Sequence, residues 1–166
     1  MIKYLIAFII VSCCWSCDQT EEKAVTKNTD FYALQLKVDT IAIAQLSNKA
    51  EEFANEWNDY LAIKTEITRT KAMNIGDALN NAENIIRISD SLKISLPDTF
   101  NVEPIKARLK LIETQAKTQQ QLLNRKSQDT AAIKESIYKL VQGFSSLNRQ
   151  INERFIETPQ FIEPKN

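Results

Sequence analysis

Carboxylate side chains recur at helical spacing in the first half of the chain, where they could bind a metal ion or act as a general acid and base. Glu52, Glu56 and Asp59 stand at positions i, i+4 and i+7, and Glu51 precedes them. A di-metal site in a helical bundle needs inward-pointing carboxylates together with histidines at Glu-x-x-His spacing. The sequence has no histidine, and these carboxylates flank the apolar position Trp57. We therefore predict a solvated acidic face with no metal and no catalytic role.

The composition excludes further kinds of site. A chain without histidine has no Ser-His-Asp triad and no Cys-His pair, and two glycines among 166 residues leave no room for a Gly-rich phosphate loop. Lys and Arg number 21, as do Asp and Glu, and this neutral balance argues against a nucleic-acid binder, which usually carries a basic face. We expect no enzymatic activity, no cofactor and no nucleic-acid partner.

Basic residues gather in one later stretch, which could touch an anionic lipid or a glycan. They could equally pair with the acidic side of residues 51–59 across a bundle surface. Exposed pairs add little stability but can fix the order of helices, so we favour this structural role. The basic residues are Lys106, Arg108, Lys110, Lys117, Arg125 and Lys126, set against Glu103 and Glu113.

Polar and aromatic residues at helical spacing are the remaining candidates for a binding site. Lys64, Ser89 and Gln119 interrupt apolar seams, where such residues more often set helix register, and a lysine can reach solvent along its apolar stem. Six aromatic residues could line a cavity for an apolar ligand, but their helical spacing predicts core packing. They are Phe53, Trp57, Tyr60, Tyr138, Phe144 and Phe155.

Four helical stretches would position these side chains. The first runs from about Leu46 to Lys71, with apolar residues at steps of three and four, and we predict one long helix there. The break at residues 74–77 contains Gly76, and Asn74 is a plausible N-cap for the second helix, which ends before Pro97. We favour a full chain reversal at Gly76; a kink there would leave three helices.

The third helix is expected from about Asn101, since Pro104 is tolerated in a first turn. The fourth follows the turn at residues 127–130, with Ser127 or Asp129 as its cap, and ends before Pro159. Residues 31–38 alternate in polarity like a strand but have no strand partner, so a helix or irregular structure is expected there.

Short connections force sequential helices to lie antiparallel. We therefore predict an all-α fold, an up-down antiparallel bundle of four helices (three if Gly76 is a kink) with coiled-coil-like packing over residues 31–157. Residues 158–166 form a C-terminal tail. Its adjacent apolar residues Phe161 and Ile162 could either pack back on the bundle or dock on a partner.

The N-terminus has the pattern of an export signal. Lys3 is followed by an unbroken apolar run from Tyr4 to Val11. This run is shorter than the roughly 20 residues that a membrane-spanning helix requires. All three cysteines lie close behind it, at positions 13, 14 and 17, so a disulfide framework is not expected in the rest of the chain.

The segment Ser12 to Asp18 (Ser-Cys-Cys-Trp-Ser-Cys-Asp) resembles the lipobox of bacterial lipoproteins, in particular the short signals of Bacteroidota lipoproteins. In that family a small residue precedes a cysteine, which is diacylated on its sulfur and becomes the new N-terminus. We favour Cys17 as the lipid attachment site because Asp18 and a polar stretch follow it directly. Cys13 is the alternative, since Ser12 and an aliphatic residue precede it in the usual lipobox manner.

The resemblance divides the chain into a signal peptide at residues 1–16, a lipidated cysteine with a flexible tether at residues 17–30, and the helical domain. It implies an exported protein anchored by lipid in the bacterial cell envelope, with the outer membrane expected and the periplasm or cell surface as its setting. We expect a non-enzymatic protein that offers its bundle to an envelope protein partner or a ligand. The alternative is a carrier or sensor that holds a small apolar molecule between its helices.

Overall fold

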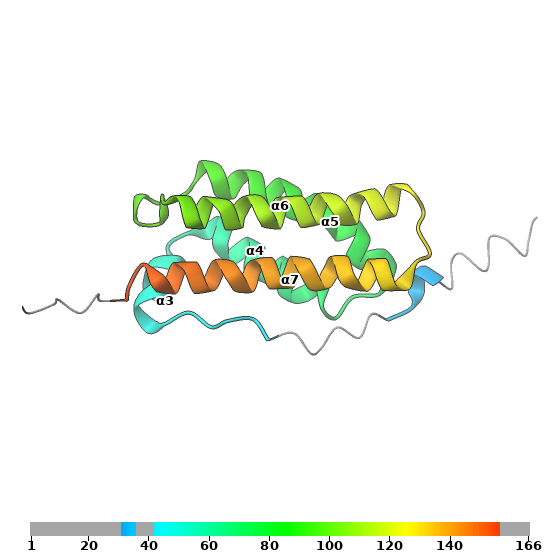
Figure 1. The fold of residues 1–166 in the computed structure, drawn as a ribbon, viewed down its shortest axis with the longest axis horizontal. Coiled ribbons are helices and arrows are strands. Elements are labelled where there is room, and N and C mark those ends of the chain that lie inside the picture. The colour runs from blue at the N-terminus through cyan, green and yellow to red at the C-terminus, as the bar shows by residue number, and fades with distance from the viewer. Residues whose placement is uncertain (1–30, 36–41, 157–166) are drawn as a thin grey trace, which may run out of the picture. The chain divides into compact units, whose positions relative to one another are not determined.

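The computed structural model describes residues 31–35 and 42–156 (Figure 1). The chain divides into two units, Met1–Phe31 and Tyr32–Asn166, and every described residue except Phe31 belongs to the second. The described part of the second unit is all-α. Five α-helices occur in it in order: α3 (Asn48–Asn55), α4 (Asn58–Thr70), α5 (Ile75–Ile94), α6 (Glu103–Asn124) and α7 (Thr130–Glu153). The short 3-10 helix η2 (Asp98–Phe100) joins α5 to α6.

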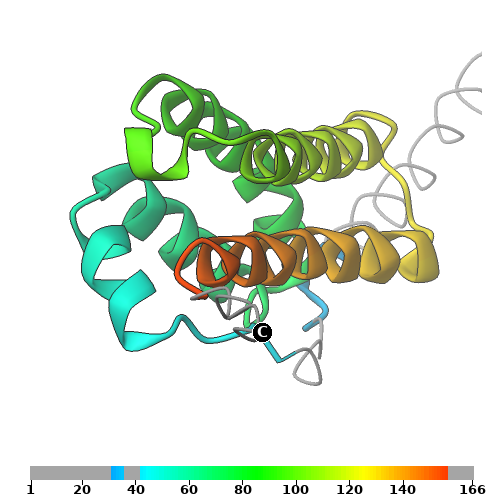
Figure 2. The ribbon, with the colours of Figure 1, turned by 60° about the vertical axis from the view of Figure 1, so that its left-hand side comes forward.

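Helices α4 to α7 form a closed ring of neighbours. Helix α4 packs against α5 and α7, and α6 packs against the same two helices. Figures 1 and 2 both show α6 and α7 running side by side. The predicted reversal at Gly76 is present, because α4 ends at Thr70 and α5 starts at Ile75 and packs back against it. The predicted all-α fold is therefore confirmed, with four long helices and the short α3 beside them.

The apolar seams expected from the sequence form the core. Helix α7 is the clearest case, because every apolar seam residue within it has no exposed surface: Ile133, Ile137, Leu140, Phe144, Leu147 and Ile151. Burying one such side chain stabilises a fold by about 1.5–3 kcal/mol. The seams of α5 and α6 are largely buried too, including Leu79, Ile85, Leu109 and Ile112, so packing of these faces holds the ring of helices together.

Local signals set the ends of the helices. Asn74 caps α5, accepting a hydrogen bond from Asp77 N at 2.8 Å, and Asp129 caps α7 by accepting one from Ala132 N at 3.0 Å. Both caps were predicted. Helix α6 ends with Lys126 in a left-handed conformation at φ 49°. The amide of Lys126 donates to Leu123 O, and that of Ser127 donates to Leu122 O, which is a Schellman motif.

The prediction of one long helix from Leu46 to Lys71 is wrong. The helix breaks at Trp57, whose backbone is extended at φ −96° and ψ 91°. The buried indole of Trp57 donates to Ser95 Oγ at 3.0 Å, and the break redirects α3 so that Phe53 stacks on Phe155 with ring centroids 5.1 Å apart. The spacing of Phe53 and Trp57 would place them on one face of a single continuous helix. The tertiary contacts of these two side chains outweigh that local preference.

Residues 31–35 are irregular beyond a short helical turn. Gln35 forms an isolated antiparallel bridge with Asn74, and Leu34 O accepts a hydrogen bond of 2.9 Å from Ile75 N. Gly76 allows this close approach, because a Cβ there would lie 3.2 Å from Tyr32 Cβ. The expectation of a helix or irregular structure therefore holds for residues 31–35, of which 31–33 are helical, while residues 36–38 lie outside the described part of the chain.

Candidate functional site

An extended segment, residues 42–46, lies along α7 and is held by polar side chains at helical spacing. Ser145 Oγ accepts from Ala44 N at 2.9 Å, and Asn148 Nδ2 donates to Ala44 O at 2.7 Å. One turn further on, Asn152 Nδ2 donates to Gln45 O at 2.9 Å. Positions 145, 148 and 152 share one face of a helix. This face supplies the hydrogen bonds that a neighbouring strand would otherwise give the segment.

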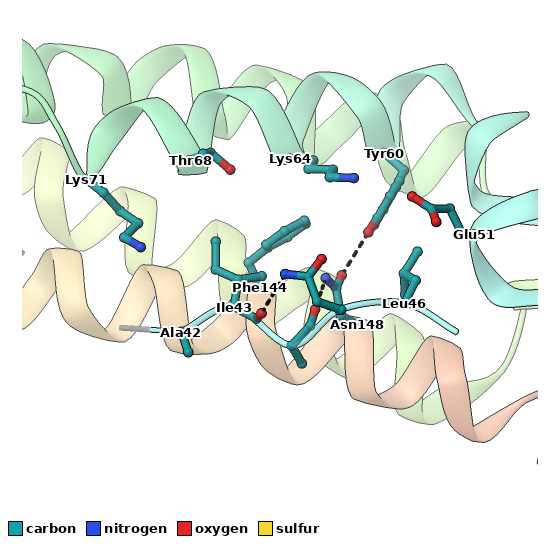
Figure 3. Close-up of a pocket in the computed structure, with 12 residues that line it drawn as sticks. Ala42, Ile43, Leu46, Glu51, Tyr60, Lys64, Thr68, Lys71, Phe144 and Asn148 are labelled. Carbon is teal, nitrogen blue, oxygen red and sulfur yellow. Dashed lines mark hydrogen bonds between the residues drawn. The ribbon is translucent and has the colours of Figure 1, made fainter. Parts of the chain in front are cut away.

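A surface pocket of about 540 Å³ lies between this segment and helices α4 and α7 (Figure 3). Lys64 and Thr68 of α4 form one wall together with Lys71, the C-cap of that helix. The other side combines apolar side chains with the hydrogen-bonded amide of Asn148 (Figure 3). The pocket is lined by Ala42, Ile43, Ala44, Gln45, Leu46, Glu51, Tyr60, Lys64, Thr68, Lys71, Phe144 and Asn148.

The hydroxyl of Tyr60 is the most perturbed titratable group beside the pocket. Burial raises the pKa of Tyr60 well above its usual value, although the hydrogen bond to Asn148 opposes the rise. The nearby carboxylate of Glu51 raises the pKa of Tyr60 further. Tyr60 is therefore neutral at physiological pH and acts as a hydrogen-bond donor at the pocket wall.

The aromatic side chains form a continuous cluster at one end of the bundle. Ring centroids 5.1–6.1 Å apart link them in the order Phe53, Phe155, Phe100, Trp57, Tyr60 and Phe144. The predicted core packing holds for Trp57, Tyr60 and Phe144, whereas Phe53 and Tyr138 are 38% and 44% exposed. Phe100 is a fully buried member that the sequence reasoning missed, because it lies in η2 outside any helical seam.

The acidic residues of the first helical stretch separate into different settings. Glu52 and Glu56 are exposed, whereas Glu51 also lines the pocket. Asp59 accepts a hydrogen bond from Ser95 Oγ, which in turn accepts from the Trp57 indole. Within residues 31–35 and 42–156, no group of three or more acidic or cysteine side chains is placed to hold a metal ion.

The basic residues of α6 do not pair with the acidic residues of α3 and α4 in any ion pair between described residues. Lys106 pairs with Glu103 and Lys117 with Glu113, both within α6. Glu113 also pairs with Lys93 of α5 at 2.8 Å. Arg108 donates to Ser146 Oγ of α7 at 2.7 Å. Helix α6 is therefore joined to α5 through Glu113 and to α7 through Arg108, which corrects the expected partner.

A second pocket, of about 530 Å³, lies where α5 ends and α6 begins. Ile94 at its edge is 88% exposed, the largest exposed fraction among the large apolar side chains of the described residues. Lys93, Lys106 and Lys110 also line this pocket. Glu113, which pairs with Lys93, lines it too, and Leu96 adds apolar surface beside Ile94.

The three polar residues that interrupt the seams do not form one site. Lys64 is half-buried at the first pocket, and Ser89 donates to Ile85 O of its own helix at 2.7 Å. Gln119 is fully buried, and neither its Nε2 nor its Oε1 has a hydrogen-bond partner among the described residues. Only Lys64 therefore contributes to a surface that another molecule can reach.

Several predicted features lie outside the described residues. They are the lipid attachment site Cys17, its alternative Cys13, and the tail residues Phe161 and Ile162. Within the described part, no helix is long and apolar enough to cross a membrane.

No protein-family model, no curated protein and no solved structure matches this chain.

Proposed function

We propose that the protein is a non-enzymatic lipoprotein of the bacterial cell envelope, anchored by lipid at Cys17. Its helical bundle contacts an envelope protein or a ligand. Anchoring is supported by the apolar run from Tyr4 to Val11 followed by the segment Ser12 to Asp18. Two or more acyl chains give stable membrane attachment, whereas a single chain does not. The outer membrane is the proposed membrane.

The observation that carries the contact role is the combination of a tightly packed interior with pockets that open on the surface. Apolar side chains from every helix of the ring have no exposed surface, including Ile63, Leu79, Ile112 and Leu140. Three pockets lined by described residues are open to solvent. A carrier of an apolar molecule would instead hold it between its helices, with most of the ligand surface buried. This arrangement therefore favours surface contact over the carrier alternative.

Anchoring is tested by labelling cells with a radioactive fatty acid. Cys17→Ala should abolish labelling and release the protein from the membrane fraction, while Cys13→Ala should keep both. Labelling that persists in Cys17→Ala but is lost in Cys13→Ala would show that Cys13 carries the lipid. Separation of inner and outer membranes tests the proposed location with the same cells.

Contact is tested by placing a photo-crosslinking amino acid at Ile94, the most exposed apolar position among the large ones described. The matched control carries the same group at Lys134, an exposed position on α7. We expect a defined adduct in intact cells from position 94 and none from position 134. Identical adducts from both positions, or none from position 94, would count against a docking surface there.

A further inference from the structure

The first pocket presents a row of hydrogen-bond donors along one face of α4. Lys64, Thr68 and Lys71 are spaced by four and three residues, which places them on one side of a helix. All three line the same pocket; Lys64 and Thr68 extend toward it from α4, and Lys71 lies just beyond the end of that helix (Figure 3). The ammonium group of Lys64 beside the hydroxyl of Thr68 suits the oxygen atoms of an anion.

Lys64 forms no ion pair with a described carboxylate. The six ion pairs between described residues involve other side chains, although Glu51 lines the same pocket. The ammonium of Lys64 is carried by a half-buried side chain. A partly buried ammonium group that has no carboxylate partner favours the binding of an anion, because contacts with the anion replace the contacts with water that burial removes.

The opposite side of the pocket consists of apolar side chains and of polar groups that already have hydrogen-bond partners. Ile43, Leu46 and Phe144 contribute apolar surface. The polar groups there are occupied, since Asn148 bonds both Tyr60 and the backbone of Ala44. A pocket of about 540 Å³ falls within the range of small-molecule sites, roughly 300–1,000 Å³. The ligand that fits both walls has an anionic group and a short apolar part.

We propose that this pocket binds a small amphipathic anion, whose carboxylate or phosphate group pairs with Lys64 beside Thr68 and Lys71. Glu51 sets the direction of binding. It lies at the far end of the pocket, beyond Tyr60 and away from Lys71 (Figure 3). Repulsion from Glu51 keeps the anionic group at the end near Lys71, and the apolar part lies against Leu46 and Phe144. Binding does not depend on lipid at Cys17.

The test measures binding by calorimetry with the full-length chain in a neutral detergent at low salt. The probes are hexanoate, hexyl phosphate and the uncharged hexanol. We expect hexanoate or hexyl phosphate to bind, and the tighter of the two identifies the preferred anionic group. Hexanol should bind at least about tenfold more weakly, since a hydrogen bond to a charged group contributes about that factor. Equal affinity for hexanol, or no binding of either anion, would overturn the proposal.

Variants locate the site. Lys64→Gln should weaken anion binding by about tenfold or more, and Lys71→Gln should weaken it as well. The control is Lys134→Gln, which removes an exposed lysine of α7 outside the pocket lining and should bind like the unaltered chain. Circular dichroism checks that each variant is folded, and Lys71→Gln decides the matter if Lys64→Gln does not fold. Equal affinity in all three variants would show that the anion binds elsewhere.

Discussion

The hydroxyl of Tyr60 donates a hydrogen bond of 3.0 Å to Asn148 Oδ1. Because the amide nitrogen of Asn148 donates to Ala44 O at 2.7 Å, one side chain of α7 ties α4 and the extended segment 42–46 to the same point. Both side chains are buried, with 1% of Tyr60 and 3% of Asn148 exposed. This bond therefore fixes the wall of the pocket as well as the position of the segment.

Asn148→Ala should lower the free energy of unfolding by about 2–4 kcal/mol. The change leaves the Tyr60 hydroxyl and the Ala44 carbonyl without their partner, and each unsatisfied buried polar group costs about 1–3 kcal/mol. The measurement is urea denaturation followed by circular dichroism. The matched control is Asn152→Ala, whose hydrogen bonds to Gln45 O of the same segment and to the amide of Ser47 are exposed. Water replaces its bonds, so a loss below about 1 kcal/mol is expected. Equal losses in the two variants would contradict this role for Asn148.

Stability should fall as the pH rises above about 10, and Tyr60 should account for part of the fall. Burial raises the pKa of Tyr60 in the folded chain above its ordinary value of 10.0. A raised pKa in the folded state means that this contribution to stability is fully present below the unfolded-state pKa and is lost as the pH rises beyond it. The urea midpoint measured from pH 8 to 11 gives the slope.

Tyr60→Phe should make that slope shallower, because phenylalanine has no proton to lose. Tyr138→Phe is the control, since Tyr138 is 44% exposed and should leave the slope unchanged. If both variants retain the slope of the unaltered chain, then other groups, such as lysines, cause the alkaline loss of stability.

The all-α fold and most helix boundaries could be predicted because local signals and burial agree. Asn and Asp are residue types that favour helix N-caps, and Asn74 and Asp129 do cap their helices. The apolar seam of α7 is buried, as its spacing indicates. The break at Trp57 could not be predicted, since helical spacing continues through it. Its cause lies in Ser95 and Phe100, which are distant in sequence.

The pocket was only partly accessible to sequence reasoning. The sequence shows Lys64 as a polar residue that interrupts an apolar seam. The pocket around Lys64 forms because the non-helical segment 42–46 lies beside α4 and α7, and the sequence does not show this. The residues that hold this segment were missed. Ser145, Asn148 and Asn152 recur at helical spacing beside the apolar seam of α7, and that polar row was the available signal. It does not by itself identify which backbone groups it binds.

Lys126→Gly should raise the free energy of unfolding by about 0.5–1 kcal/mol. Lys126 holds φ 49° at the end of α6, and the left-handed conformation costs a residue with a Cβ about 1–2 kcal/mol relative to glycine. Part of the gain is lost because glycine makes the unfolded chain more flexible. Thermal and urea denaturation measure the change. Arg125→Gly is the control, since Arg125 has a right-handed helical conformation and glycine there should destabilise. A loss of stability in Lys126→Gly would show that its side chain makes a compensating contact.

Gln119→Leu should stabilise the chain by about 1–3 kcal/mol. The amide of Gln119 is fully buried in α6, and neither of its polar atoms has a hydrogen-bond partner among the described residues. Leucine has a similar volume, keeps the helix propensity and removes the cost of the unsatisfied amide, which is of that size. The urea midpoint should rise without a change in the slope of the transition. Gln121→Leu is the control, because Gln121 is exposed on the same helix, and its effect should stay within about 0.5 kcal/mol. A destabilised Gln119→Leu would mean that the amide is satisfied in solution, by a buried water molecule bound between α6 and its neighbours.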